Sequence, residues 1–144
     1  MEKINQTGRR KTAVARVFLS EGTGKITINN RDYKEYFSVP HLQENVVMPF
    51  KLTQSEGKYD VQVNVYGGGI KGQAEAVRLG ISRCLITDVE DNRKLLKPHG
   101  LLTRDARKVE RKKPGMRIAR RRSQFGKRES ILIVVPLFYH FRKK

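Results

Sequence analysis

Lysine and arginine side chains are concentrated in residues 104–128, and they are the groups of this chain with the clearest chemistry. Twelve of these twenty-five residues are cationic and only Asp105 and Glu110 oppose them, so the stretch carries ten of the seventeen net positive charges. Eight of the twelve are arginine, whose guanidinium group binds phosphate bidentately and stacks on bases. A segment so repulsive cannot bury enough apolar surface to fold alone. The chemistry that it indicates is attraction to a polyanion.

A second candidate for chemistry is the glycine-rich stretch at residues 67–72. Gly67, Gly69 and Gly72 match the pattern G-x-G-x-x-G, which cradles the pyrophosphate of a dinucleotide when it links a strand to a helix. The pattern raises the hypothesis of a small nucleotide-dependent enzyme. Against it, no apolar strand ending in an acidic residue follows, the domain has no room for a second half-sheet, and Lys71 favours a larger anion.

Two other interpretations of the same loop stay open. In one, the glycines form a tight turn, since they permit positive φ angles and close packing of helix on sheet. In the other, backbone N–H groups at the start of the following helix bind an RNA phosphate.

The histidines and acidic residues form no catalytic or metal-binding pattern. His41, His99 and His140 are isolated, and none has a cysteine or carboxylate at metal-ligand spacing. Residues 88–91, Asp-Val-Glu-Asp, are interpreted as a solvated acidic helix end. We therefore expect no metal, no cofactor and no small-molecule substrate.

The first hundred residues carry the periodic patterns of one folded domain. Residues 12–19 predict a strand with one covered face, residues 25–29 alternate polar and apolar, and the turn residues between them predict a hairpin. Residues 59–66 alternate strictly and predict a further strand with one sheltered face.

Helices are predicted on both sides of that last strand. Asn30 or Asp32 is a candidate cap for a short helix, and Pro40 begins a second one that runs to Val47 before Pro49 ends it.

From residue 73 onward, apolar residues recur at three- and four-residue spacing as far as residue 85, which predicts an amphipathic helix packed on the sheet. Gly80 is expected to weaken that helix. A shorter helix is predicted at residues 92–96, residues 101–107 are expected to return as a last strand or extended edge, and the domain boundary is placed near Val109.

The remaining composition favours a cytosolic protein. Cys84 is the only cysteine and has apolar neighbours, so a reducing compartment is expected. Residues 1–6 contain no apolar h-region of a signal peptide. The longest apolar run, residues 131–141, is interrupted by Pro136 and His140 and is shorter than the about 20 residues of a helical membrane span.

Four blocks of sequence carry a family resemblance. They are Gly-Arg-Arg-Lys-Thr-Ala-Val-Ala-Arg-Val at residues 8–17, Gly-Gly-Gly-Ile-Lys-Gly-Gln-Ala at residues 67–74, Leu-Thr-Arg-Asp-Ala-Arg-Lys-Val-Glu-Arg-Lys-Lys at residues 102–113, and Ala-Arg-Arg-Arg-Ser-Gln-Phe-Gly-Lys-Arg at residues 119–128. In this order they resemble the bacterial family of small ribosomal subunit protein nine. The resemblance spans residues 8–128.

The resemblance implies an α+β fold and a structural role in the ribosome. The expected domain, residues 1–108, has two layers, a mostly antiparallel sheet with helices on one face, and residues 109–128 follow as a long extended basic tail. The implied partners are 16S rRNA in the head of the 30S subunit, neighbouring head proteins and the P-site tRNA, with Lys127 and Arg128 as the tRNA contacts. The residues expected to bind rRNA are Arg9, Arg10, Lys11, Lys71, Arg104, Arg107, Lys108, Arg111, Lys112, Lys113, Arg117, Arg120, Arg121, Arg122 and Phe125.

Residues 129–144 depart from the family pattern, which typically ends at the Lys-Arg pair. They are apolar and rich in β-forming residues. Three fates are open: a strand added to this domain or to a neighbour, a cover over rRNA in a crevice, or an unselected extension from a displaced stop codon. As an exposed free end they would be an aggregation hazard.

Overall fold

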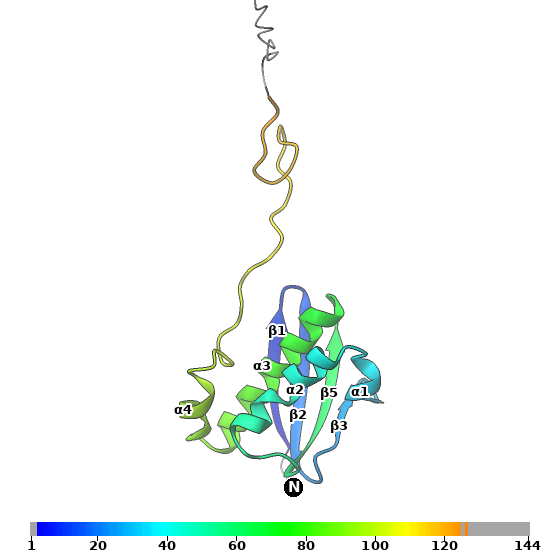
Figure 1. Cartoon of the computed structure of the whole chain (residues 1–144), viewed down its shortest axis with the longest axis vertical. Coiled ribbons are helices and arrows are strands. Elements are labelled where there is room, and N and C mark those ends of the chain that lie inside the picture. The colour runs from blue at the N-terminus through cyan, green and yellow to red at the C-terminus, as the bar shows by residue number, and fades with distance from the viewer. Residues whose placement is uncertain (1–2, 125, 127–144) are drawn as a thin grey trace, which may run out of the picture. The chain divides into compact units, whose positions relative to one another are not determined.

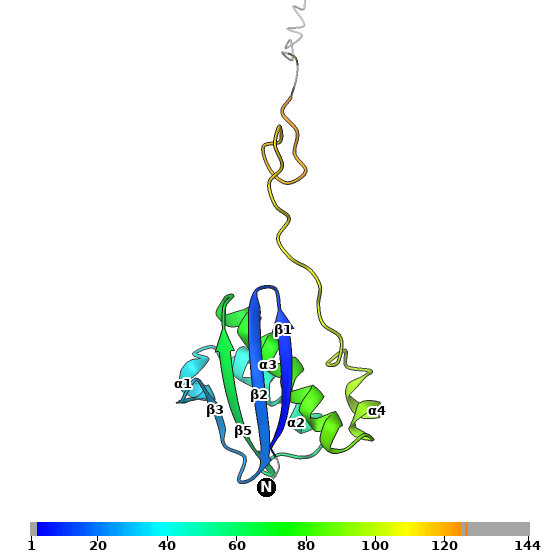
Figure 2. The same cartoon turned by 180° about the vertical axis from the view of Figure 1, so that it is seen from behind.

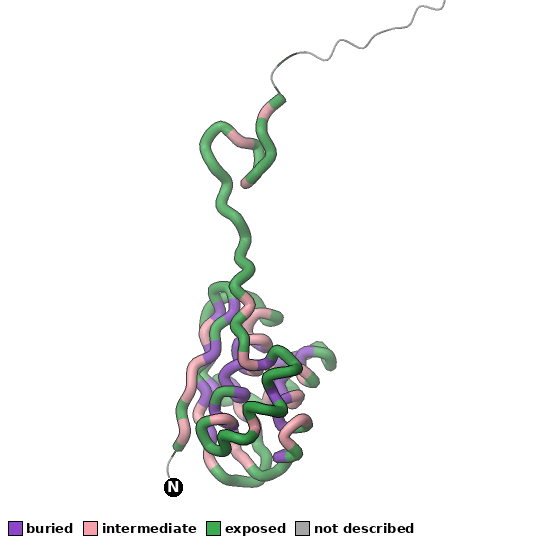
Figure 3. Tube along the Cα trace, turned by 90° about the vertical axis from the view of Figure 1, so that its left-hand side faces the viewer, coloured by how far each residue is buried: buried purple, intermediate pink, exposed green. Residues whose placement is uncertain are grey.

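The computed structural model describes residues 3–124 and residue 126. By its internal contacts the chain divides into two units, Met1–Lys108 and Val109–Lys144. The first unit holds all the helices and named strands of the described residues (Figure 1). In the second unit, residues 109–124 contain no buried residue, and the tube of Figure 3 is green or pink throughout this stretch.

Five strands form one sheet in the order β1-β2-β5-β3-β4. β1 (Ile4–Arg10) pairs antiparallel with β2 (Ala13–Glu21), which in turn pairs antiparallel with β5 (Tyr59–Tyr66). β3 (Ile26–Ile28) runs parallel to β5 and antiparallel to the short β4 (Arg31–Asp32). The expected α+β class with a mostly antiparallel sheet is therefore confirmed.

The helices are α1 (Tyr33–Tyr36), α2 (Pro40–Leu52), α3 (Ile70–Asp88) and α4 (Asn92–Leu96). Figure 2 shows β1, β2 and β5 in front with α2 and α3 behind them, so both helices cover the same face of the sheet. Among the helices of the described residues, none is long and apolar enough to cross a membrane.

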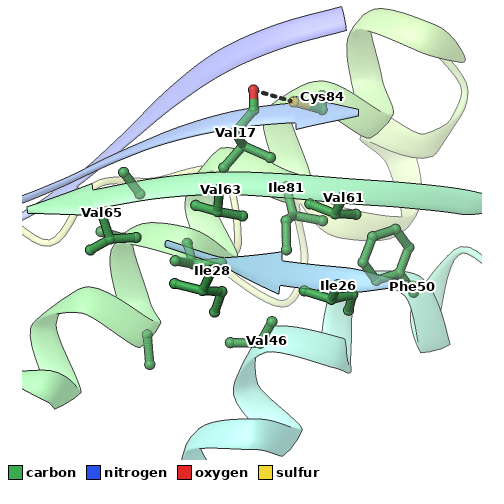
Figure 4. Close-up of a cluster of buried hydrophobic side chains, with 14 of the residues drawn as sticks. Val17, Ile26, Ile28, Val46, Phe50, Val61, Val63, Val65, Ile81 and Cys84 are labelled. Atoms are coloured by element: carbon green, nitrogen blue, oxygen red, sulfur yellow. Dashed lines mark hydrogen bonds between the residues drawn. The ribbon is translucent and has the colours of Figure 1, made fainter. Parts of the chain in front are cut away.

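The core lies between these two layers. Along β5, Val61, Val63 and Val65 are buried and the residues between them are exposed, which is the two-residue period of a strand with one covered face. α3 supplies Ile81 and Cys84 to the same cluster (Figure 4). Burial raises the pKa of the Cys84 thiol to about 12, so the thiol stays protonated within the core.

Two glycines allow α3 to lie close to β1 and β2. A Cβ atom on Gly8 would lie 1.9 Å from the backbone carbonyl oxygen of Ala76, and a Cβ atom on Gly80 would lie 2.5 Å from Cγ2 of Val17. Both distances are far below van der Waals contact. Gly80 lies within the continuous helix α3, and its place in the fold is the contact with the sheet; the expected weakening of the helix stays a prediction.

The predicted hairpin of residues 12–19 with residues 25–29 is wrong. β2 pairs instead with β1, whose central residues are too polar to indicate a strand, and β5 lies between β2 and β3. The carboxylate of Asp60, at the start of β5, accepts hydrogen bonds from the backbone N–H groups of Thr23 (2.8 Å) and Lys25 (2.9 Å). These bonds tie the loop after β2 to β5, so β3 continues on the far side of β5.

Some boundaries of the other elements agree with the predictions and others differ from them. β5 and α4 match the predictions, and Asp32 caps α1 by accepting a hydrogen bond from the N–H of Lys34. α2 does not end before Pro49 but includes it, since the proline removes only its own N–H and Thr53 still donates to its carbonyl. Residues 101–107 form no strand.

The close approach of α3 to β1 predicts that Gly8→Ala destabilises the protein. The added methyl group meets backbone atoms that cannot rotate away, so we expect a loss of about 3 kcal/mol in the free energy of unfolding, measured by urea denaturation. Gly72→Ala is the matched control, because its Cβ would lie 3.6 Å from the nearest atom and alanine favours the helix. Equal stabilities of the two variants would contradict the packing argument.

Candidate nucleic-acid interface

Three segments far apart in the sequence meet where β1 turns into β2. A Cβ atom on Gly67 would lie 2.7 Å from the carbonyl oxygen of Thr12, so the loop before α3 is packed against the β1–β2 turn. The guanidinium group of Arg10 reaches residues 105–107 from the other side. The exposed cations on these segments, which we call the basic end, are Arg9, Lys11, Lys71, Arg104, Arg107 and Lys108.

The glycine loop is a tight turn that packs against the hairpin. Gly67 and Gly68 have φ angles of 72° and 67°, a region that side chains disfavour. A Cβ atom on Gly68 would also lie 2.9 Å from the backbone nitrogen of Ala13. The interpretation of this loop as a turn that permits positive φ and close packing is confirmed.

Arg10 differs from the other predicted site residues because it is only 8% exposed. Its guanidinium group forms ion pairs with Glu75 on α3 and with Asp105 (Nη2 to Oδ2, 2.8 Å). It also donates a hydrogen bond of 2.8 Å to the carbonyl oxygen of Arg107. Arg10 therefore joins β1, α3 and the segment that leads out of the first unit.

Asp105 fixes the local conformation of that segment. Its carboxylate accepts hydrogen bonds from the backbone N–H of Arg107 (2.9 Å) and from the guanidinium group of the same residue (2.7 Å from Nη2). The side-chain bonds with Arg107, its backbone N–H and the charge of Arg10 hold the pKa of Asp105 well below its usual range. An ionised Asp105 thus turns the Arg107 guanidinium toward itself and leaves that side chain exposed.

The second unit presents its cations to solvent around a small loop. Met116 and Arg122 form an isolated antiparallel bridge, and the N–H of Arg117 donates to the carbonyl of Arg121 at 2.8 Å. The only carboxylate of residues 109–124, Glu110, accepts a hydrogen bond of 2.8 Å from Nε of Arg120, and this bond lowers the pKa of Glu110. Within residues 109–124 the exposed cations are Arg111, Lys112, Lys113, Arg117, Arg120, Arg121 and Arg122.

The predicted site residues therefore fall into three groups. Six form the basic end, seven belong to the second unit, and Arg10 is buried as the link to residues 105–107. Phe125, Lys127 and Arg128 lie outside the described residues. Sequence reasoning missed the role of Glu75 and treated Asp105 only as an opposing charge. The one sequence signal that could have indicated the role of Asp105 was its position as an acidic residue between Arg104 and Arg107.

Taken together, the fold and the site define a class of protein: a small α+β domain with a cationic end, followed by a solvent-exposed basic segment. Comparison with protein families makes this class specific. The family model described as ribosomal protein S9/S16 matches residues 8–128, and the chain belongs to this family.

Curated relatives agree with the family match. The chain is 57% identical over 128 residues to the small ribosomal subunit protein uS9 of Christiangramia forsetii, covering 89% of this chain and all of the relative. It is 55% identical to the uS9 protein of Flavobacterium psychrophilum with the same coverage. It is 52% identical over 122 residues to that of Borreliella burgdorferi, covering 85% of this chain and 90% of the relative.

Family membership settles the class of function. The protein is a structural component of the small ribosomal subunit, located in the cytoplasm within a ribonucleoprotein that carries out translation, and it is not an enzyme. The hypothesis of a nucleotide-dependent enzyme is therefore wrong. Of its fingerprint glycines, Gly67 is explained by positive φ and by the contact with the β1–β2 turn, whereas a Cβ atom on Gly69 would meet no atom within 4 Å.

The burial of Arg10 predicts that Arg10→Met releases residues 105–107 from the domain. Removing the cation leaves Glu75 and Asp105 without their shared partner, so we expect a loss of about 3 kcal/mol in stability. Trypsin should cleave faster at Arg104, Arg107 and Lys108, measured by mass spectrometry of the fragments. Arg9→Met is the matched control, since that neighbouring side chain is exposed. Equal cleavage rates in the two variants would show that Arg10 does not hold the segment.

Proposed function

We propose that this protein binds 16S rRNA in the head of the small subunit through the basic end and residues 109–128, beside neighbouring head proteins. The observation that carries the proposal is the exposure of the cations of the second unit. Residues 109–124 bury no side chain, and Glu110 is their only acidic group. A segment with this charge and no core gains more from neutralisation by phosphates than from packing on itself.

Two kinds of contact favour RNA, rather than diffuse counter-ions, as the partner of this segment. The arginines of this segment offer planar donor pairs that match phosphate oxygens. RNA binding also replaces the ion pair of Arg120 with Glu110, which is exposed on both sides and contributes little. The arginine-rich segment therefore fits the mode in which such a segment follows RNA grooves and orders there.

The basic end contributes a second set of phosphate contacts. Lys71 is exposed on the first turn of α3, whose N-cap, Gly69, makes no side-chain hydrogen bond to the helix. The free N–H groups of this turn and the helix dipole favour an anion there. A phosphate of 16S rRNA at this turn is the RNA-binding interpretation of the glycine loop, and it is compatible with the packing of Gly67 and Gly68.

The contact with P-site tRNA is proposed for Lys127 and Arg128. The family match ends at Arg128, and these two cations close the basic stretch of residues 104–128. Both lie outside the described residues, as does the apolar stretch of residues 129–144. The three alternatives for that stretch stay predictions.

We expect the triple substitution Arg120→Ala, Arg121→Ala and Arg122→Ala to weaken binding to 16S rRNA and to flatten its salt dependence. Each lost phosphate contact should reduce the slope of log K against log salt by about 0.7 to 0.9, measured by filter binding. The triple variant Lys34→Ala, Lys51→Ala and Lys97→Ala removes the same charge from other exposed positions and should leave the slope unchanged. An identical slope in both variants would mean that the three arginines do not contact phosphates.

Arg128→Ala should weaken retention of P-site tRNA without impairing assembly of the subunit. Loss of one charge-assisted contact corresponds to about a tenfold faster dissociation of tRNA from reconstituted particles. Lys143→Ala, beyond the family match, is the control. Normal tRNA retention in the Arg128 variant, with the protein present at full occupancy, would remove this residue from the proposed contact.

A further inference from the structure

The face of the sheet opposite α2 and α3 carries a second pattern of polar and aromatic side chains. Figure 2 looks onto this face, and none of the helices or strands within residues 3–108 covers it. Its residues alternate with the buried ones along β1, β2 and β5, and all of them are exposed or half-buried. We call this surface the open face, and its main members are Asn5, Thr7, Arg9, Val14, Arg16, Phe18, Gln62, Asn64 and Tyr66. Ser20 and Asp60 continue the alternation at the end far from Tyr66, where the Asp60 carboxylate accepts hydrogen bonds from the backbone N–H groups of Thr23 and Lys25.

The strand register arranges these side chains in three rows across the sheet. Neighbouring strands lie about 4.8 Å apart, so members of one row touch and adjacent rows are within reach of long side chains. The rows are Arg9, Val14 and Tyr66, then Thr7, Arg16 and Asn64, then Asn5, Phe18 and Gln62. Tyr66 thus has an arginine in its own row and another in the next.

Tyr66 is the aromatic residue that this surface presents most openly. It is 55% exposed although it ends a strand whose other face is in the core. An exposed ring on a flat sheet is stabilised when a second flat apolar surface packs against it. A nucleobase provides such a surface by stacking, whatever the identity of the base.

The charges around Tyr66 indicate a polyanion. Arg9 and Arg16 are both exposed, neither forms an ion pair with a carboxylate of the described residues, and none of the three rows contains an acidic side chain. The remaining polar members, Asn64 and Gln62 among them, offer amide donors and acceptors that suit base edges and 2′-hydroxyl groups. A docking protein would leave two buried cations unpaired unless it brought matching carboxylates.

We propose that the open face binds unpaired nucleotides of RNA. A base stacks on the Tyr66 ring, Arg9 and Arg16 contact the flanking phosphates, and Asn64 hydrogen-bonds the next nucleotide. Paired RNA is a poor ligand, since its bases are already stacked and a flat sheet cannot enter its deep, narrow major groove. The inference rests on the proposed function only in taking RNA as the partner. The site is separate from residues 109–124.

The test compares a single-stranded uridine RNA of about 12 nucleotides with a duplex of the same length, using the full chain and fluorescence anisotropy over a salt series. Tyr66→Ala should lower the affinity for the single strand about tenfold at every salt concentration and leave duplex binding unchanged. Tyr66→Phe should keep the wild-type affinity, because the ring is retained. Arg16→Ala should reduce the salt slope for the single strand by about 0.7.

Leu95→Ala is the control, because it removes a comparably exposed apolar side chain from α4 and should change neither affinity. Thermal unfolding verifies that each variant is folded. An unchanged affinity in Tyr66→Ala, or an equal loss for single strand and duplex, would overturn the proposal. The triple arginine variant separates the two proposals: its salt slope should be reduced, but it should keep the preference for single strands. An unaltered slope there refutes the proposed function and leaves the Tyr66 result standing.

The assembled 30S particle gives the decisive second measurement. After ultraviolet irradiation, the peptide that contains Tyr66 should carry a cross-linked nucleotide, and Tyr66→Ala should abolish this product. If chemical cross-linking instead joins the open face to another protein of the particle and no nucleotide is found there, the occupant is a protein and the proposal is wrong.

Discussion

The attachment of residues 105–107 to the domain depends on one buried guanidinium group. In a chain with seventeen excess positive charges, Arg10 is placed inside the domain and matched by two carboxylates, Glu75 and Asp105. A buried ion pair adds little net stability compared with apolar packing, but leaving one of its charges alone is costly. The consequence here is specificity: residues 105–107 are held against β1 and α3 in one arrangement, and their other cations remain outside.

The packing around Arg10 depends on residues without side chains. Gly8 and Gly80 let α3 approach β1, and Gly67 and Gly68 let the loop before α3 approach the β1–β2 turn. These backbone contacts bring three segments together at the basic end without using charged groups. The cations of that end are exposed, and Gly67, which belongs to the apparent nucleotide fingerprint, instead packs the loop against the β1–β2 turn.

The two proposed RNA sites would bind through different interactions. Residues 109–128 offer many charges, and residues 109–124 bury no side chain, so the affinity of this stretch should fall steeply with salt. The open face offers one exposed ring, two arginines and amides on a preformed sheet, so a larger share of its affinity should come from stacking and survive high salt. A protein with both can combine long-range attraction with a rigid contact to a few unpaired nucleotides.

The sequence by itself determined the local elements, the charge distribution and the family. Strict alternation predicted β5, a short pattern ended by Pro98 and Gly100 predicted α4, and the four ordered blocks pointed to the ribosomal family, because each of these signals lies within neighbouring residues. Only the tertiary structure decided the strand order and the fate of Arg10. β3 pairs with β5 after a loop tied to Asp60, β1 is a strand despite polar residues, and Arg10 finds the carboxylates of Glu75 and Asp105, which lie 65 and 95 positions away. Such contacts join distant segments and leave no periodic pattern in the sequence. Arg10, which becomes buried, therefore cannot be distinguished from its exposed neighbour Arg9 until the fold brings the carboxylates close to it.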